Sequence, residues 1–567
     1  MAAVESQGDV KINAVAGSGK TTLLIEYAKK RKGSILYLAF NKSVKDEARR
    51  RFAGLPHVRV ETAHSLAFHH MVKGTSLKLR ANGYKTHELA DLLGIRSSSS
   101  VGTFVMANHI RRYADWFMNS RAKKLRDLDY MTQVQGERAR GFVEGNRETI
   151  YNGAMDFLSK MYRGEAELTH DFYLKMFQLR EPMLDFDFIL FDEGQDASPS
   201  MLDVFLNQRG TKVIVGDTNQ QIYGWRHAIN SLENTDLPAL ALTNSFRFNQ
   251  NIANLASEIL DRKHLFVPHD QVVIHGTGPQ NKDKTHAVLA RSNLGLLLRA
   301  TEAAFGEKPV RRIHFEGNFS TYAYAGEGAS LYDVLNLKNG KHERIRDPLI
   351  AHMNDIKELT EYVDATDDRE LGMMVSIVEK YGKEIPTIMR ELKNRHTEDR
   401  RDAQMIFSTV HRAKGMEYGT VTIAPDFPTE SNLKKQAEED DADLARLNEE
   451  VNTLYVAVTR AINRLEIPGF LMPKDFEAGK GIEVIESKKE PELPENVRRN
   501  SRQPYKNRQS RPRRKKATNA NRVWTKADDH ELVEMDNAGQ SIPDIADHFG
   551  RSKMAVWMRL KKILEGY

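Results

Sequence analysis

Short apolar runs followed by amphipathic stretches alternate along the first part of the chain. Val10 and Ile12 lead into a glycine-rich turn and a helix-forming run. Residues 34–52 repeat the pattern as a buried strand and a basic helix, and residues 58–68 read as a further strand that ends in polar residues. Strands that alternate with helices favour a parallel α/β sheet with functional loops at the carboxyl ends of its strands.

The alternation of strands and helices stops at about residue 74. Residues 74–180 have a mostly helical pattern with interleaved basic and aromatic side chains, so we predict a helical insertion. Its basic face suits nucleic acid and, equally, a solvated helix surface. The strand pattern returns at 186–196 (FDFILFDEGQD) and again at 211–228, where a buried strand runs into a polar-aromatic loop. These segments complete one predicted α/β lobe.

A second α/β series begins at 287–293. It continues with a strand, a basic loop and a strand at 405–425, and with an amphipathic helix and a strand at 449–467. Between them, residues 316–400 are irregular and then helical, which indicates another insertion. The pattern therefore predicts two α/β lobes, each with a mostly helical insertion.

Composition narrows the class of protein. The 567 residues allow several domains, and the 40% hydrophobic and 29% charged fractions are ordinary for globular material. We find no apolar run of about 18 residues and no signal-peptide pattern. The absence of cysteine excludes disulfides, thiolate zinc fingers and iron–sulfur clusters. We expect no membrane partner and a cytoplasmic location, nucleoid-associated in a bacterial or phage-infected cell.

The first glycine-rich turn, NAVAGSGKTTL at 13–23, has the chemistry of a phosphate loop. Gly17 and Gly19 allow backbone N–H groups to turn towards an anion at a helix N-terminus. Lys20 neutralises phosphate charge, and the Thr21 hydroxyl is suited to ligate Mg²⁺. This segment predicts nucleotide binding; a chance glycine-rich turn is the alternative.

Paired acids follow the apolar run FILF. Asp192 is placed to hold Mg²⁺ through water, and Glu193 is placed to accept a proton from the attacking water. A surface acid pair is the alternative, but surface acids rarely follow so apolar a strand. Further along, Gln220 is a candidate sensor of the terminal phosphate. Tyr223 and Trp225 suggest a stacking surface, with core packing of the tryptophan as the alternative.

The order of these segments resembles that of the UvrD/Rep-type superfamily 1 helicases over roughly residues 10–470. AVAGSGKT resembles that family's phosphate loop, in which alanine at the position of Ala14 is common. The other matching blocks, in chain order, are DEGQD, VGDTNQQIYGWR, LTNSFR, STVHRAKGMEY and NTLYVAVTRA. The segments HFEG (314–317) and SLYDVLNL (330–337) resemble the F-box DNA helicase branch.

The resemblance implies two RecA-like lobes with ATP and Mg²⁺ in the cleft between them. It implies catalytic roles for Lys20, Glu193, Gln220, Arg247 and Arg460, with Thr21 and Asp192 at the metal. It implies nucleotide contacts from Ala16, Gly17, Ser18, Gly19, Lys20, Thr21, Thr22, Phe246 and Glu417. The implied single-strand path is lined by Phe40, Asn41, Thr62, His64, Tyr223, Trp225 and His411.

Two departures from the family concern the adenine. Relatives carry a glutamine-bearing segment about twenty residues before the phosphate-loop lysine, and Gln7 stands too close to Lys20 to replace it. Thr22 occupies a position where many relatives have an arginine against the base. The phosphate chemistry is therefore better defined by the sequence than the choice of base.

The C-terminal region has a different composition. Residues 497–522 contain eleven Lys or Arg and no Asp or Glu, which is typical of a flexible linker that contacts nucleic acid or of a solvated spacer. Beyond it, residues 522–564 predict three short helices. Thr525 and Asp528 form a capping-box-like start, Gly539 ends the first helix, and a second short helix and Gly550 precede a basic third helix.

This arrangement predicts a helix-turn-helix and resembles Myb/SANT-like DNA-binding domains. A SANT module that binds protein is the alternative. In the candidate recognition helix and its approach, the residues expected to contact DNA are Arg551, Lys553, Arg559 and Lys562.

The predicted organisation is as follows: a first RecA-like lobe at 1–73 and 181–247; a helical insertion at 74–180; a second RecA-like lobe at 248–315 and 401–475; a second insertion at 316–400; a linker at 476–521; and a helix-turn-helix domain at 522–567. The resemblance implies an ATP-dependent helicase or translocase moving 3′→5′ on single-stranded DNA. The alternative is a recruitment protein whose DNA-stimulated ATPase acts as a switch or strips proteins from DNA without unwinding; RNA is a third, weaker substrate. We expect single-stranded and duplex DNA as partners and replication or recombination proteins as candidate partners. The sequence does not define the oligomeric state, for which a monomer is one candidate.

Overall fold

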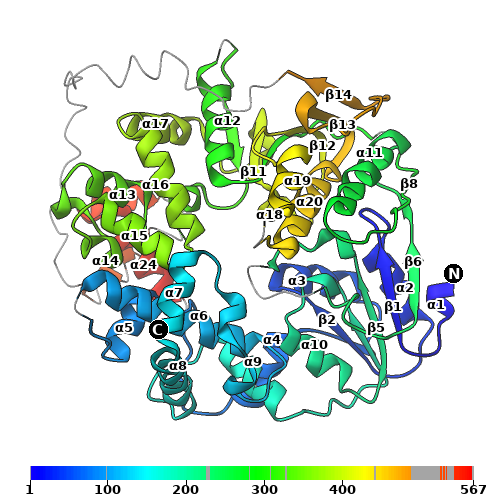
Figure 1. Cartoon of the computed structure of the whole chain (residues 1–567), viewed down its shortest axis with the longest axis horizontal. Helices are drawn as coiled ribbons and strands as arrows, with labels where there is room; N and C mark the ends of the chain where they lie inside the picture. Colours follow the sequence, from blue (N-terminus) through cyan, green and yellow to red (C-terminus); the bar gives the residue numbers. More distant parts are fainter. Residues whose placement is uncertain are drawn as a thin grey trace. The chain divides into compact units, whose positions relative to one another are not determined.

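Two parallel six-stranded sheets form the framework of residues 1–501, the first of two units into which the chain divides (Figure 1). The computed structural model describes residues 2–97, 99–224, 230–279, 281–306, 308–325, 328–439, 442–486, 524–525, 528–529, 531–532, 535 and 542–564. The second unit, residues 502–567, is described separately below. Mixed α/β architecture with parallel sheets confirms the α/β part of the predicted fold class.

The first sheet has the strand order β3-β2-β4-β5-β1-β6. Its centre is apolar on both faces because helices cover it, and Ile12 of β1 lies in register with Val215 of β5 and Leu240 of β6. The strands are β1 (Val10–Ala14), β2 (Ile35–Ala39), β3 (Val58–Thr62), β4 (Phe188–Phe191), β5 (Thr211–Gly216) and β6 (Ala239–Leu242). The helices of this lobe are α1 (Ala2–Glu5), α2 (Lys20–Lys29), α3 (Lys42–Arg51), α4 (Ala63–Met71) and α10 (Pro199–Leu206).

The second sheet has the order β10-β11-β9-β12-β13-β14. Its strands are β9 (His286–Ala290), β10 (Ile313–Phe315), β11 (Met405–Thr409), β12 (Tyr418–Ile423), β13 (Ala461–Pro468) and β14 (Ile482–Ile485). Its helices are α11 (Gln250–Asp261), α12 (Asn293–Phe305), α18 (Val410–Ala413), α19 (Glu430–Ala437) and α20 (Leu444–Val458). A short parallel pair, β7 (Asn244–Ser245) with β8 (His275–Gly276), flanks α11 in sequence.

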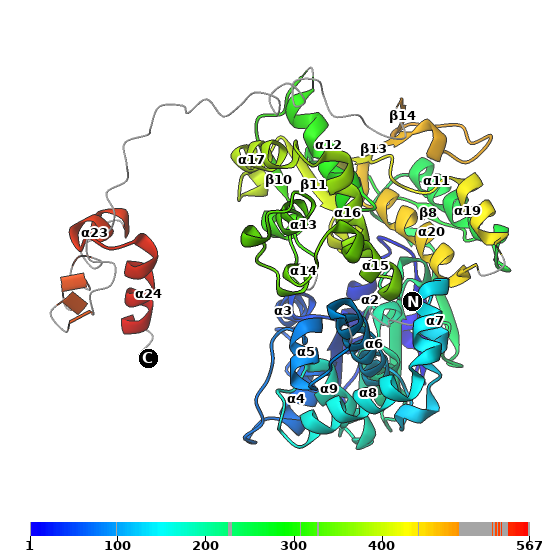
Figure 2. The same cartoon turned by 60° about the vertical axis from the view of Figure 1, so that its left-hand side comes forward.

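Each lobe carries a helical insertion, as Figure 2 shows. The first, between β3 and β4, contains α5 (Thr86–Leu92), α6 (Ser100–Asn119), α7 (Glu137–Gly145), α8 (Arg147–Tyr162) and α9 (His170–Leu179). The second, between β10 and β11, contains α13 (Leu331–Lys338), α14 (Pro348–Ala351), α15 (Ile356–Thr366), α16 (Arg369–Tyr381) and α17 (Ile385–Arg395).

The two insertions share one apolar core. Phe104 and Ala107 of α6 belong to the same buried cluster as Leu359 and Tyr362 of α15. His109 crosses this junction, because its Nε2 lies 2.9 Å from the carbonyl oxygen of Ala365. Burial lowers the pKa of His109 to about 4, so the ring stays neutral in the junction at neutral pH.

Three sequence-based boundaries need correction. The predicted linker began at 476, but β14 at 482–485 pairs with β13 and extends the second lobe. Its short half-exposed IEVI run stands among charged residues and gives a weak strand signal. The predicted strand at 58–68 ends at Thr62, whose side chain and that of Ser65 form a capping box that starts α4. The predicted basic loop within 405–425 contains the short helix α18.

In the second unit, the described residues include α23 (Ile542–His548) and α24 (Lys553–Leu564). The predicted capping box is confirmed, since Thr525 N donates to Asp528 and Asp528 N donates to the Thr525 hydroxyl. Leu532, Ile545, Ala546, Phe549, Val556 and Leu560 form a small buried core. Gly539 and residues 487–523, which hold most of the predicted linker, lie outside the described residues. The helix-turn-helix assignment stays a prediction.

Among the described helices, none combines the length and apolarity needed to cross a bilayer.

Candidate nucleotide site and nucleic-acid interface

The phosphate loop has the backbone that its glycines predict. Gly17 and Gly19 adopt left-handed conformations with φ of 76° and 80°, and Gly19 precedes the first residue of α2. A Cβ at position 17 would lie 2.7 Å from Cβ of Arg247, so only glycine allows the segment 245–247 to lie against the loop. The amide of Phe246 donates to the carbonyl oxygen of Gly17 at 2.9 Å.

The acidic pair lies beside this loop. The Thr21 hydroxyl donates to Asp192 at 3.2 Å, and Lys20 Nζ lies 3.9 Å from Glu193. Burial, followed by the charge of Glu193, raises the pKa of Asp192 to about 6. For Glu193, burial opposes ionisation, but the charges of Lys20 and Lys414 outweigh it and lower its pKa. Of the two acids, Glu193 therefore loses its proton at the lower pH.

These residues fit a nucleotide and Mg²⁺. The Ser18 hydroxyl is buried in the phosphate loop and has no hydrogen-bond partner among the described residues, which is an orphaned donor where a phosphate oxygen would sit. Thr21 and Asp192 supply oxygen ligands of the kind that Mg²⁺ takes from proteins, with phosphate and water completing its shell. Glu193 has the left-handed φ of 54°, a backbone conformation that costs a non-glycine residue free energy.

Two arginines from the rest of the chain face the loop. The Arg460 side chain is almost fully buried and lies 3.4 Å from the Gln220 side-chain oxygen. Burial, reinforced by the charge of Arg247, lowers the pKa of Arg460 to about 9, so it stays charged. Arg247 donates to Glu417 and to the Thr459 carbonyl oxygen, each at 2.9 Å. The structure thus brings together the predicted lysine, acids, glutamine and arginines.

A tyrosine that the sequence analysis missed connects the two lobes at this point. The Tyr455 hydroxyl of α20 accepts a hydrogen bond from the backbone amide of Ala16 at 3.2 Å and donates to Asp217 at 3.0 Å. The same Asp217 oxygen accepts from Gln220 Nε2 at 2.8 Å. Asp217 follows the apolar strand β5 as Asp192 follows β4, and this repeated signal was available in the sequence.

A buried ion pair forms a second connection. Lys414, after α18, lies 2.5 Å from Asp196, and its amine also donates to the Gln220 carbonyl oxygen at 2.6 Å. Burial raises the pKa of Asp196 to about 6, against the opposing charge of Lys414. Gln195, beside Asp196, donates to Glu193 at 2.6 Å. The second lobe therefore contacts the segment of the first lobe that carries Asp192 and Glu193.

The end of the site expected to hold the base is less enclosed. The Phe246 side chain is 64% exposed, as expected for a ring available to stack. The Thr22 hydroxyl accepts a hydrogen bond at 2.9 Å from Arg51 of α3. Arg51 therefore lies beside Thr22, the position at which many relatives have an arginine, although Arg51 comes from a different helix.

Three of the residues expected to line the single-strand path meet at the junction of the lobes. The Phe40 and Tyr223 rings stack with centroids 6.1 Å apart, and the Tyr223 hydroxyl donates to the His411 carbonyl oxygen at 2.9 Å. The amine of Lys414 lies 4.8 Å from the centroid of the Tyr223 ring. Burial lowers the pKa of His411 to about 4, so it is a neutral contact at physiological pH. Trp225 lies outside the described residues.

The other path residues lie at the carboxyl ends of neighbouring strands. Asn41 caps α3, and Thr62 caps α4. His64 is the second residue of α4, with its Nε2 3.3 Å from Asp171. Because β2 and β3 pair directly, these three residues lie at one edge of the first sheet. Asn41 and Thr62 therefore have a structural role as helix caps. Contacts of all three residues with DNA stay predictions.

In the second unit, two residues expected at DNA have internal partners. Arg551 is buried and stacks on Trp524 with 4.3 Å to the ring centroid, and Arg559 forms a two-pronged ion pair with Asp529 at 2.6 Å. Lys553 is exposed. The Lys562 side chain lies outside the described residues.

Comparison with known proteins agrees with this geometry. Residues 1–236 match the UvrD/REP helicase N-terminal domain, and residues 321–469 match the UvrD-like helicase C-terminal domain. The chain belongs to the UvrD/Rep-type superfamily 1 helicases. The two matches leave out residues 237–320, so the LTNSFR block with Phe246 and Arg247 and the first part of the second lobe lie outside both.

Curated relatives of this helicase family include F-box DNA helicase 1 of Gallus gallus, 30% identical over 80% of this chain and 46% of the relative. F-box DNA helicase protein 1 of Schizosaccharomyces pombe is 28% identical over 80% of this chain and 55% of the relative. The chain thus spans about half the length of these relatives. A solved structure, "The structure of PRRSV helicase", matches 82% of this chain and 54% of that one at 12% identity, with a TM-score of 0.28 too low to support an argument.

Proposed function

We propose that this chain is an ATP-dependent motor that translocates on single-stranded DNA and unwinds duplex DNA, with 3′→5′ polarity expected from its family. The observation that carries the proposal is the composition of the cleft. Phosphate-binding and water-activating residues come from the first lobe, whereas Glu417 and Arg460 come from the second, and Arg247 comes from the segment that joins β7 to α11. Nucleotide binding would therefore draw the lobes together, and product release would separate them.

ATP and Mg²⁺ would supply the phosphoryl group and its counter-charge. Lys20 and the loop amides would hold the phosphates, and Thr21 and Asp192 would hold the metal. Glu193, ionised and bonded to Gln195, would orient the attacking water and accept its proton. The two arginines would stabilise charge on the transferred group, because a guanidinium stays protonated even in this buried setting.

Coupling to DNA is supported by the Lys414 segment. Lys414 contacts Asp196 and Gln220 at the nucleotide side and lies over the Tyr223 ring at the junction of the lobes. A change at the terminal phosphate would thus reach a stacking aromatic through directly bonded groups. A base on an aromatic ring is held by about 1–3 kcal/mol whatever its sequence, which suits a motor that steps along arbitrary DNA.

Strand displacement on a 3′-tailed duplex tests this proposal, together with ATPase rates measured with and without single-stranded DNA. Lys20→Ala is the control, because it removes the phosphate-binding amine. DNA-stimulated hydrolysis without displacement would favour the switch-like ATPase, and stimulation by RNA alone would identify a different substrate. Parallel measurements with GTP, CTP and UTP report how strictly the open base end selects adenine.

We also propose that the second unit tethers the motor to duplex DNA. A small module on a linker raises the effective concentration of the motor near the site that the module binds. Since β14 belongs to the second lobe, the deletion that tests this begins after it, at residue 487. The proposal expects a weaker duplex affinity and a smaller salt dependence in the truncated chain. Equal affinity and equal salt slope would refute it.

A further inference from the structure

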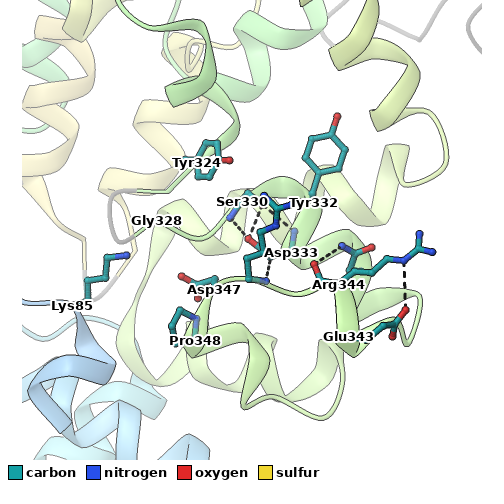
Figure 3. A pocket seen from close by; sticks show the side chains of 12 residues that line it. Lys85, Tyr324, Gly328, Ser330, Tyr332, Asp333, Glu343, Arg344, Asp347 and Pro348 are labelled. Carbon is teal, nitrogen blue, oxygen red and sulfur yellow. Dashed lines mark hydrogen bonds and ion pairs between the residues drawn. The ribbon is translucent and has the colours of Figure 1, made fainter. Parts of the chain in front are cut away.

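A cavity of about 610 Å³ lies on the second insertion, outside the nucleotide site, and Figure 3 shows the side chains around it. Its lining comes from the segment 324–348, with the single addition of Lys85 from the first insertion. The volume falls within the usual range of ligand-binding cavities, about 300–1,000 Å³. None of the residues assigned above to ATP or to the strand path lines it.

The wall of the cavity is fixed by a buried carboxylate. Asp333 accepts hydrogen bonds from the Ser330 hydroxyl at 2.7 Å, the Ser330 amide at 3.0 Å and the Arg346 amide at 2.7 Å. Asn336 donates to the Arg344 carbonyl oxygen at 3.3 Å. These contacts hold the loop from 343 to 347 against α13 by its backbone and leave the arginine side chains exposed.

The cavity lining holds three basic side chains, Lys85, Arg344 and Arg346, and three acidic ones, Asp333, Glu343 and Asp347. The charge of Asp333 is already satisfied by its three donors. Asp347 is buried, and burial raises its pKa, so it is less readily charged than an exposed aspartate. Arg344 pairs loosely with Glu343 at 3.5 Å, and the described part of the chain offers no hydrogen-bond or ion-pair partner to the Arg346 guanidinium.

The lysine among these basic side chains comes from the other insertion. A Cβ at Gly328 would lie 2.8 Å from Lys85 Nζ, so the amine lies directly against the cavity wall. Gly328 itself has the left-handed φ of 102°, which favours glycine here. The cavity therefore joins an insertion carried by the first lobe to one carried by the second.

Two aromatic rings complete the lining. Tyr324 is 47% exposed and Tyr332 is 40% exposed, so solvent reaches both rings. Exposed rings beside unpaired cations are the combination that binds bases and phosphates of an unpaired strand without sequence preference. A ring can stack fully only on a base that has left the double helix, so a single strand fits better than a duplex.

We propose that this cavity binds one nucleotide of a single DNA strand, with the base on Tyr324 or Tyr332 and the phosphate at Arg346 and Lys85. The inference rests on the proposed action of the chain on DNA and adds a second strand contact outside the lobe junction. Because the cavity bridges both insertions, a strand held there is fastened to both lobes. Such a contact would keep a displaced or incoming strand away from the motor track.

Photocrosslinking of the full chain tests the site directly. A single-stranded oligonucleotide carrying 5-iododeoxyuridine is irradiated with the protein, and the crosslinked peptides are mapped by mass spectrometry. We expect crosslinks at Tyr324 or Tyr332 in addition to those at the lobe junction. Crosslinks at the lobe junction alone would overturn this inference and leave the proposed function intact, whereas absence of any strand binding by the unmodified chain would overturn both.

Binding measurements on variants add a quantitative test. The double variant Tyr324→Ala/Tyr332→Ala should bind a 30-nucleotide strand about fivefold or more weakly, the lower limit expected for losing one stacked base. Arg346→Gln should reduce the slope of log K against log salt by about 0.7, for the one phosphate of the bound nucleotide.

Tyr162→Ala is the matched control, since Tyr162 is 70% exposed on α8 and lies outside the cavity. It should leave affinity and salt slope unchanged. Equal affinity of the cavity variants and the control, with unchanged melting temperatures, would contradict the inference. Crosslink mapping on the unmodified chain decides the matter independently if a variant fails to fold.

Discussion

The hydroxyl group of Tyr455 offers the sharpest test of how the two lobes meet. It is fully buried, accepts from the Ala16 amide of the phosphate loop and donates to Asp217, the residue that also holds Gln220. Tyr455→Phe removes this oxygen and leaves the ring and its packing in place. We expect the change to weaken closure of the lobes around the nucleotide without unfolding either lobe.

The magnitude follows from the two bonds. A buried donor left without a partner costs about 1–3 kcal/mol, and a hydrogen bond to a charged acceptor contributes about 1.5–3 kcal/mol. Since the two effects overlap, we expect a loss of about 2–4 kcal/mol in the closed state. That corresponds to a fall of about 30-fold to 1,000-fold in kcat/KM for ATP hydrolysis.

Steady-state ATPase kinetics with saturating single-stranded DNA measure this loss. Tyr27→Phe is the matched control, because Tyr27 is equally buried on α2 and its hydroxyl has no hydrogen-bond partner among the described residues. The control should keep wild-type kinetics. If Tyr455→Phe also stays within twofold of wild type, the hydroxyl does not link the lobes in the active state and the reasoning fails.

Three further predictions concern other charged groups. Lys414→Met leaves Asp196 buried without its partner, which should destabilise the first unit by about 3–5 kcal/mol in thermal unfolding and uncouple ATP hydrolysis from DNA. Burial raises the pKa of Glu449 to about 7, so the folded state holds its proton more tightly than the unfolded state and loses stability as pH rises towards 7. Glu449→Gln should therefore increase the free energy of unfolding at pH 8 by about 1–3 kcal/mol, which is measured as a higher melting temperature. Near pH 4.5 the substitution should leave the melting temperature unchanged. In the second unit, Lys553→Ala should lower duplex affinity and reduce the salt slope by about 0.9, whereas Arg559→Ala should lower the melting temperature of the unit.

A specific experimental result would contradict each of these predictions. A Lys414→Met chain with unchanged stability would mean that Asp196 is neutral in the folded protein. A melting temperature of Glu449→Gln that rises equally at both pH values would indicate a packing effect. Loss of DNA affinity in Arg559→Ala without loss of stability would show that the ion pair with Asp529 opens on DNA.

The phosphate side of the site could be predicted because its signals are local. Apolar strands that end in polar residues place those residues at one edge of a parallel sheet, so Lys20, Asp192 and Gln220 could be expected to meet. Gly17 and Gly19 are visible in the sequence, and glycine at these positions predicts the left-handed backbone that the phosphate loop adopts. The same logic extends to Asp217, which ends β5 in the way that Asp192 ends β4.

Contacts between distant segments could not be predicted in this way. The bond between Ala16 and Tyr455 joins residues 439 positions apart, and nothing in the periodicity of α20 distinguishes that tyrosine from a core residue. Arg51 reaches Thr22 from another helix, and the shared core of the insertions joins segments of different lobes. These contacts depend on how the lobes close, which the pattern of one element does not encode.

The C-terminal arginines illustrate a further limit. A basic helix after a glycine turn indicates a DNA-binding surface, yet a guanidinium serves equally well to stack on an aromatic ring or to close an ion pair within the fold. Arg551 stacks on Trp524 and Arg559 binds Asp529, so the same cations that suggest a nucleic-acid contact stabilise the small core instead. A domain this small buries little apolar surface and needs such contacts to hold its helices together. Charge on a short helix therefore indicates a binding surface only after the internal partners of each cation are known, and by that criterion Lys553 is the strongest remaining candidate for duplex DNA.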